Sequence, residues 1–294
     1  MLSRVAPWSL SRNTFARSPV RILSHADTDA LRLLVAADPV ANVFVASQLE
    51  ATGTAVPNIP GAVMLGIPDD GGALAAACWV GANVVPVGAT EIHARAFGQW
   101  LAASQRSFAS IFGPAEAVLP LFGELEADGA HALEIRANQP LMSLAGDPAV
   151  APNELLAPSL LEDFPQILTA AAAMFEEEVG YSPFLGGAEH YRRRVKDLIR
   201  AGHSLSHCGD DGEVIFKADL GAVSTAASQV QGVWMNPAYR GLGMSAGYMA
   251  AVVLLSRKFA PVTSLYVNDY NSRARAVYER VGFTQVGTFA TVLF

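Results

Sequence analysis

The chain has 294 residues, of which 51% are hydrophobic and 16% charged, and its formal net charge is -7. This composition is typical of a folded protein with a sizeable core and excludes wholesale disorder. The acidic balance argues against a nucleic-acid partner, which would favour a basic surface, and gives no support for docking on an anionic membrane. No apolar stretch approaches the roughly 18 residues that span a bilayer. We therefore expect a cytoplasmic protein.

The first twenty residues, MLSRVAPWSLSRNTFARSPV, contain arginines but no acidic residue. They lack the continuous apolar segment of a secretory signal, and we predict a flexible lead-in over residues 1–20. The two cysteines, Cys78 and Cys208, are far apart in the sequence and are predicted to be free thiols. His203 and His207 are four residues apart, but no carboxylate motif accompanies them, so no metal site is expected.

The next segment, residues 21–146, is predicted to begin with two helices separated at Pro39. The apolar runs AVMLGI and ALAAACWVG flank PDDGG, which predicts a β-hairpin because Asp-Gly tolerates the turn dihedrals. The remaining elements are predicted as a strand at NVVPVG, a helix over 91–104, a strand at SFASIFGP, a helix over 114–127 and a strand at HALEIRANQPLMSL.

Three prolines in GDPAVAPNELLAPS predict a linker over residues 147–158. The second half, residues 159–294, is predicted to contain two helices, then strands at SLSHC, EVIFKADL and QVQGVWM, a glycine turn, a helix over 244–259, a strand at TSLYVND, a helix over 272–281 and a terminal strand pair in GFTQVGTFATVLF. The first half follows nearly the same order of elements. This repeated order predicts two tandem, related α/β domains.

The stretch YRGLGMSAG, residues 239–247, places glycines where a helix begins. The first turn of a helix leaves N–H groups unpaired at the positive end of its dipole, and glycine lets a ligand approach them closely. The pattern therefore favours a phosphate or pyrophosphate site. The alternative is that these glycines serve only a tight turn or close packing.

A dinucleotide site is a second alternative, because Gly241, Gly243 and Ala246 satisfy G-x-G-x-x-G/A. Such a turn is expected directly after the first strand of a long parallel sheet. Here residues 236–240 intervene, and only about fifty residues follow the turn. The context therefore disfavours an NAD-linked enzyme, and the sequence also lacks the P-loop pattern G-x-x-x-x-G-K-[ST].

Two linked motifs carry a family resemblance: GVWMNPAYRGLGMSAGYMAAVV and LYVNDYNSRARAVYERVGF. Together they resemble the GNAT superfamily of acyl-CoA-dependent N-acyltransferases, whose pattern is a strand ending in V-x-P, then R-x-x-G-x-G/A, then N-x-x-A-x-x-x-Y-x-x-x-G-F. Met235 replaces the usual valine, and Ser245 occupies the last small position of the loop. The resemblance covers roughly residues 155–294.

The first half, with DPVANVFVASQLE and GANVVPV, resembles an uncharacterised domain found before GNAT modules in some bacterial proteins. The resemblance implies two tandem GNAT-like domains, each with a mixed, mostly antiparallel sheet flanked by helices. It also implies that the first domain is degenerate and holds no cofactor of its own.

The resemblance implies that acetyl-CoA is the co-substrate and that no metal is needed. Backbone amides of residues 240–245 would hold the pyrophosphate, and the edge of residues 233–235 would pair with the pantetheine arm. Asn271 would bond the arm or, alternatively, cap its own helix. The implied cofactor-binding residues are Val233, Trp234, Met235, Arg240, Gly241, Leu242, Gly243, Met244, Ser245 and Asn271.

Tyr278 is the implied catalytic residue, because a phenol near the sulfur can protonate the leaving thiolate. Its alternative role is packing in an apolar helix stripe. The general base stays open: the strand before the glycine turn contains Gln229 and Gln231 but no acid. The candidates for base or substrate binding are Asp219, Asp269, Glu176, Glu177 and Glu178, with a chain of waters as another route. The three glutamates could also be a solvated helix end.

The sequence thus predicts an acyl-CoA-dependent N-acyltransferase, most simply an acetyltransferase acting on a primary amine of a small molecule or a protein. A homodimer is compatible with this prediction. The alternative from another class is a non-catalytic acyl-CoA sensor or regulatory protein, which the missing strand glutamate favours.

Overall fold

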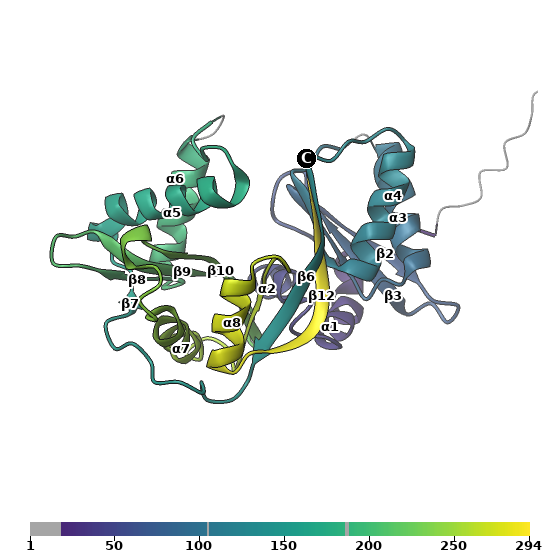
Figure 1. Ribbon diagram of the computed structural model, residues 1–294. Helices are drawn as coiled ribbons and strands as arrows, with labels where there is room; N and C mark the ends of the chain where they lie inside the picture. The colour runs from purple at the N-terminus through teal and green to yellow at the C-terminus, as the bar shows by residue number, and fades with distance from the viewer. Residues whose placement is uncertain (1–18, 105, 186–187) are drawn as a thin grey trace, which may run out of the picture.

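The computed structural model describes residues 19–104, 106–185 and 188–294. Within them the chain forms a mixed α/β fold around one 12-stranded sheet, with the strand order β1-β2-β3-β4-β5-β12-β6-β11-β10-β9-β8-β7. Helices cover both faces of the sheet (Figure 1). The predicted lead-in over residues 1–20 lies almost wholly outside the described residues. Among the described helices, none is both long and apolar enough to cross a membrane.

The N-terminal half places two helix pairs on opposite faces of its strands. Side chains that alternate along β3 pack in separate clusters: Ala77 and Trp79 lie with α1 and α2, and Cys78 and Val80 lie with α3 and α4. The elements are β1 (Arg21–Ile22), η1 (His25–Asp27), α1 (Thr28–Ala36), α2 (Val43–Thr52), β2 (Val63–Pro68), β3 (Leu74–Val80), β4 (Asn83–Val87), α3 (Glu91–Ser104), β5 (Ser110–Pro114), α4 (Ala115–Ala127) and β6 (Glu134–Leu144).

The C-terminal half repeats this arrangement. Figure 1 shows α5 and α6 on one side of strands β8 to β10, and α7 and α8 on the other. The elements are β7 (Ala157–Pro158), η2 (Leu161–Asp163), α5 (Phe164–Val179), α6 (Ala188–Arg200), β8 (Ser204–Cys208), β9 (Val214–Val223), β10 (Ala227–Met235), η3 (Pro237–Tyr239), α7 (Ser245–Ser256), β11 (Val262–Tyr266), α8 (Ser272–Val281) and β12 (Thr284–Leu293).

The last strands of the two halves are exchanged. β12, the C-terminal strand, pairs antiparallel with β5 of the N-terminal half, and β6 pairs antiparallel with β11 of the C-terminal half. β6 and β12 also pair with each other along the centre of the molecule (Figure 1). Each half therefore completes the sheet of the other, and the sheet is continuous. The proposed division at residues 21–146, 147–158 and 159–294 stays a prediction.

The hairpin predicted around PDDGG is confirmed. β2 and β3 pair antiparallel, and Gly72 in the turn has φ 85°, which glycine adopts without a steric penalty. The predicted terminal strand pair is wrong, because residues 284–293 form one strand, β12. Register shifts near Gly287 and after Phe289 let this strand continue past an irregularity instead of turning back.

Candidate functional site

The C-terminal half contains a split in its sheet. β10 and β11 are parallel, but they pair only where Ala227, Ser228 and Gln229 face residues 262–264. Beyond this point β10 stays paired with β9, and β11 stays paired with β6. Within the described residues, β10 therefore has no strand partner on the β11 side beyond Gln229, and this open edge over residues 230–235 is called the gap. An extended ligand would pair with β10 here.

The glycine turn lies at the end of this gap. Gly241 and Gly243 have φ of 80° and 75°, and a Cβ added to either would meet nothing within 4 Å. Residues 241–243 are exposed, while Met244 and Ser245 are half-buried at the start of α7. Within the described residues no side chain caps α7, and its first turn contains no acid. The Arg240 amide, expected to face the pyrophosphate, instead donates to the Pro237 carbonyl at 3.3 Å. The exposed backbone of residues 241–243 and the first turn of α7 form an open cradle at the positive end of a helix, a geometry suited to a diphosphate.

The strand leading into the turn is fixed by Asn236. Its side-chain oxygen accepts a hydrogen bond from the Ala238 amide at 3.0 Å and caps η3. Its amide nitrogen donates to the Val214 carbonyl at 3.3 Å, and Asn236 itself is buried. The cradle is consequently anchored to the neighbouring strand β9.

The side chain of Arg240 connects the turn to the end of α5. Its Nε donates to the Met235 carbonyl at 2.8 Å, and its Nη2 bonds both oxygens of Glu177 at 2.8 and 2.9 Å. The indole of Trp234 also donates to Glu177, at 3.1 Å. Glu177, predicted to bind substrate, thus joins two residues predicted to bind the cofactor.

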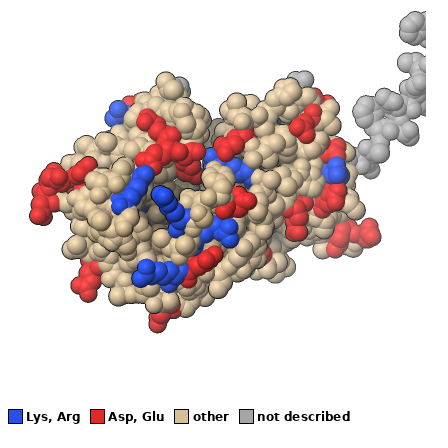
Figure 2. All heavy atoms as spheres, viewed as in Figure 1, with Lys and Arg blue, Asp and Glu red and all other residues tan. Residues whose placement is uncertain are grey.

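The neighbouring glutamates have different surroundings. Glu178 pairs with Arg136 of the exchanged strand β6 at 3.4 Å, and Arg136 also pairs with Glu134 at 2.9 Å. Figure 2 shows acidic and basic side chains around a hollow on this face, over the region that α5, β10 and α8 occupy in Figure 1. The exchanged strand therefore brings an arginine of the N-terminal half to the C-terminal site.

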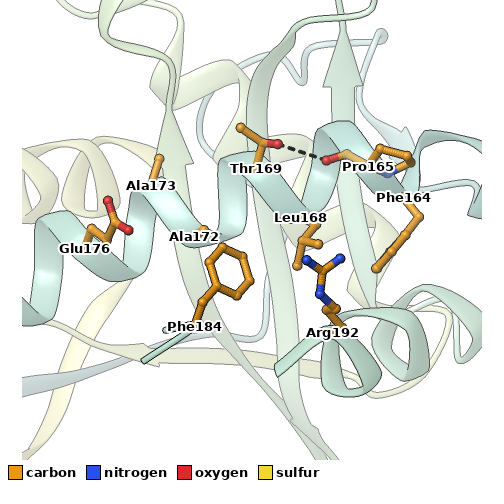
Figure 3. Close-up of a pocket in the computed structure, with 9 residues that line it drawn as sticks. All are labelled: Phe164, Pro165, Leu168, Thr169, Ala172, Ala173, Glu176, Phe184 and Arg192. Atoms are coloured by element: carbon orange, nitrogen blue, oxygen red, sulfur yellow. Dashed lines mark hydrogen bonds between the residues drawn. The ribbon is translucent and has the colours of Figure 1, made fainter. Parts of the chain in front are cut away.

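Glu176 lies instead at a groove of about 550 Å³ between α5 and α6. Figure 3 shows Phe184 and Arg192 facing α5 across this groove. The other lining residues are mainly apolar and comprise Phe164, Pro165, Leu168, Thr169, Ala172 and Ala173. Of the predicted site residues, only Glu176 lines it.

Asp219 lies on β9, opposite Gln231 of β10. It forms an ion pair with Lys217, whose Nζ is 2.7 Å from the Asp219 Oδ2, and both residues are buried. Lys217 was not among the predicted site residues, although a single lysine in the largely apolar run EVIFKADL was a usable signal. Asp269 is bonded to Asn138 of β6 at 3.1 Å. Among the described residues, no group of three His, Cys, Asp or Glu is placed to hold a metal.

Tyr278 lies on α8, 7% exposed, and its ring packs edge-to-face with Phe283 at 6.0 Å between centroids. Burial raises the pKa of Tyr278 to about 12, and the Glu178 carboxylate contributes in the same direction. The phenol therefore stays protonated at neutral pH and is able to donate a proton. Asn271 caps α8, since its side-chain oxygen accepts from the Ala274 amide at 3.1 Å. Of the two roles that the sequence left open for Asn271, the structure therefore shows the helix cap.

Solved structures that resemble this chain over most of its length include acetyltransferases of the GNAT family. A GCN5-related N-acetyltransferase from Sphaerobacter thermophilus has a TM-score of 0.58 and 16% identity, covering 93% of this chain and 94% of its own. A GNAT-family acetyltransferase from Colwellia psychrerythraea has a TM-score of 0.54 and 12% identity, covering 94% and 99%. The fold is that of GNAT acetyltransferases.

The structure of a Drosophila protein is also similar to this chain, with a TM-score of 0.64 and 15% identity, covering 94% of this chain and 98% of its own. The family model described as a domain of unknown function (DUF4081) matches residues 62–167. No curated protein matches the sequence. At these identities the structural likeness establishes the GNAT fold, and the activity follows as a proposal.

Proposed function

We propose that this protein is an acyl-CoA-dependent N-acyltransferase whose active site lies in the C-terminal half and whose co-substrate is acetyl-CoA. The observation that carries the proposal is the split between β10 and β11, which ends at the open glycine turn before α7. An open strand edge for an extended arm and a cradle for a diphosphate are the two features that would hold CoA, and here they are adjacent in the chain.

The proposed reaction joins the acetyl group to a primary amine. The amine nitrogen attacks the thioester carbon, a tetrahedral intermediate forms, and the C–S bond then breaks. A backbone amide of residues 233–235 stabilises the intermediate's oxyanion, and the buried phenol of Tyr278 gives its proton to the leaving thiolate. The acceptor's own proton goes to one of the candidate carboxylates, Asp269 or the glutamates at 176–178, or to a chain of waters.

The test combines binding with turnover. Isothermal titration calorimetry with acetyl-CoA and with NAD should give binding to acetyl-CoA alone, at one site per chain. A thiol reagent that detects released CoA then reports turnover on a panel of amines. Absence of any acetyl-CoA binding, or binding of NAD instead, contradicts the proposal.

A second candidate is a non-catalytic acyl-CoA sensor. It is favoured by the absence of an acid on β10, where Gln229 and Gln231 stand instead. The sensor predicts tight acetyl-CoA binding without CoA release on any amine in the panel.

A further inference from the structure

A buried ion pair lies directly against the bulge of β10. Lys217 is fully buried, and its Nζ bonds both the Asp219 carboxylate at 2.7 Å and the Gly232 carbonyl at 3.2 Å. A lysine buried without partners is unfavourable, so these two acceptors explain how its charge is tolerated. The second acceptor is a backbone group on the strand that borders the gap.

The bulge itself is clear in the strand register. Gln231 faces Asp219 and Trp234 faces Lys217, so β10 advances three residues while β9 advances two. The extra residue is accommodated at Gly232, whose φ is 60°. A Cβ at this glycine would lie 3.1 Å from the Asp219 Oδ2 and 3.4 Å from the Lys217 Nζ. The ion pair is therefore packed against the Gly232 backbone.

The orientation of one amide follows from this contact. A trans peptide is planar, and its C=O and N–H point in opposite directions. Because the Gly232 carbonyl points to the Lys217 Nζ, the Val233 N–H of the same peptide points away from that ammonium group. β11 lies on the other side of β10 from β9, and at this level it no longer pairs with β10.

We propose that Lys217, held in place by Asp219, is a positioning residue that turns the Val233 amide toward the acyl carbonyl of a thioester bound in the gap. This inference rests on the proposed function and deepens it. The amide is aimed before the substrate arrives, and donors fixed in this way stabilise developing negative charge well. In this arrangement the Asp219 carboxylate holds the Lys217 ammonium group in place and does not act as the general base.

The test compares binding of acetyl-CoA and CoA to the full chain. The main variant is Lys217→Met/Asp219→Leu, which removes both buried charges together, because such paired replacements often preserve folding. The matched control is Ser256→Ala/Thr263→Val. It removes a buried polar pair, joined at 2.5 Å, where β11 begins and still pairs with β10.

The wild type should bind acetyl-CoA more tightly than CoA, and one hydrogen bond to the carbonyl corresponds to roughly three- to tenfold in affinity. In the Lys217→Met/Asp219→Leu variant this preference should be lost while CoA affinity stays within about twofold. The control should keep the preference. A general loss of packing would instead lower the affinities for acetyl-CoA and CoA to the same extent.

The acetyl methyl also distinguishes the two ligands, so the infrared stretch of a ¹³C-labelled acetyl carbonyl provides the second readout. It should be lowered on binding to the wild type and return toward its solution frequency in the double variant. An unchanged preference and an unchanged stretch in the variant overturn the inference and leave the proposed function standing. A wild type that binds neither ligand overturns the proposed function itself.

Discussion

The two halves of the molecule make the same strand-to-helix connection in different ways. In the C-terminal half, residues 236–244 connect β10 to α7 and include two glycines with left-handed φ. In the N-terminal half, only residues 88–90 connect β4 to α3, and the first helical residue is Glu91. A carboxylate in the first turn of a helix interacts favourably with the positive end of the helix dipole, but it repels a bound anion such as a phosphate. The same topology therefore gives one long turn without an acid at the helix start and one short turn followed by an acid.

The gaps beside these connections also differ. β4 and β5 pair only through Asn83 and Val84 before they diverge, as β10 and β11 do. In the N-terminal half Pro86 lies over Gly113, where an added Cβ would be 3.5 Å from the proline ring. Proline also has no N–H to offer to a ligand strand. The same fold therefore does not by itself make a cofactor site, and these differences favour binding of CoA in the C-terminal half.

The largest expected effect tests whether the halves are independent. Val292 is fully buried in β12, yet it packs in the core of the N-terminal half. Val292→Asp should destabilise the whole chain by roughly 3–5 kcal/mol, because an unpaired charge is placed in the core. Val286→Asp on the same strand is the control, since Val286 is 54% exposed. Urea unfolding followed by circular dichroism should show one transition; a C-terminal half that survives separately would contradict the coupling.

The second-largest expected effect is on CoA affinity, and it distinguishes the turn before α7 from the turn before α3. Gly243→Asp should weaken CoA binding by roughly 100-fold or more, because a carboxylate then faces the diphosphate. Gly243→Ala has the same backbone strain without the charge and should bind far better. Thr90→Asp, at the corresponding exposed turn before α3, should leave the affinity unchanged. Calorimetry measures all three, and equal affinities for Gly243→Asp and wild type would refute the cradle.

Tyr278→Phe should lower turnover by roughly tenfold to 100-fold with little change in acetyl-CoA affinity, since only a proton donor is removed. The pKa of Tyr278 is raised to about 12, because burial disfavours the phenolate. Its deprotonation should therefore produce no fall in kcat below about pH 11. Steady-state kinetics on an amine found in the panel checks both points. Equal rates would reduce Tyr278 to a packing role.

The smallest effect concerns the link between α5 and the turn. Both partners of the Arg240–Glu177 pair are about half exposed, so Glu177→Gln should change stability by no more than about 1 kcal/mol. It releases the guanidinium toward the cradle, and CoA affinity should rise roughly two- to threefold at low salt and fall back at high salt. Glu176→Gln, on the neighbouring position, is the control. Weaker binding in Glu177→Gln would show that the pair supports the cradle instead.

Local patterns were sufficient for most of the elements. The helix α3 begins and ends where the sequence predicts, and the Asp-Gly turn between β2 and β3 was readable, because hydrophobic periodicity and turn chemistry act over a few residues. The terminal strand pair was misread because Gly287 resembles a turn signal, whereas the chain continues through it in one strand. The helix-capping role of Asn271 could also be read from the sequence, because asparagine directly before a predicted helix is a common N-cap.

The glycine turn, the tyrosine on α8 and most of the order of helices and strands, apart from the terminal strand, were readable in the sequence. The exchange of β6 and β12, the contact of Arg136 with Glu178 and the bond from Lys217 to the Gly232 carbonyl were visible only in the assembled fold. The physical reason is that alternation along a strand specifies which face is buried but not which strand lies beside it. Contacts between distant segments depend on that choice of neighbour, and they become visible only once the whole sheet is assembled.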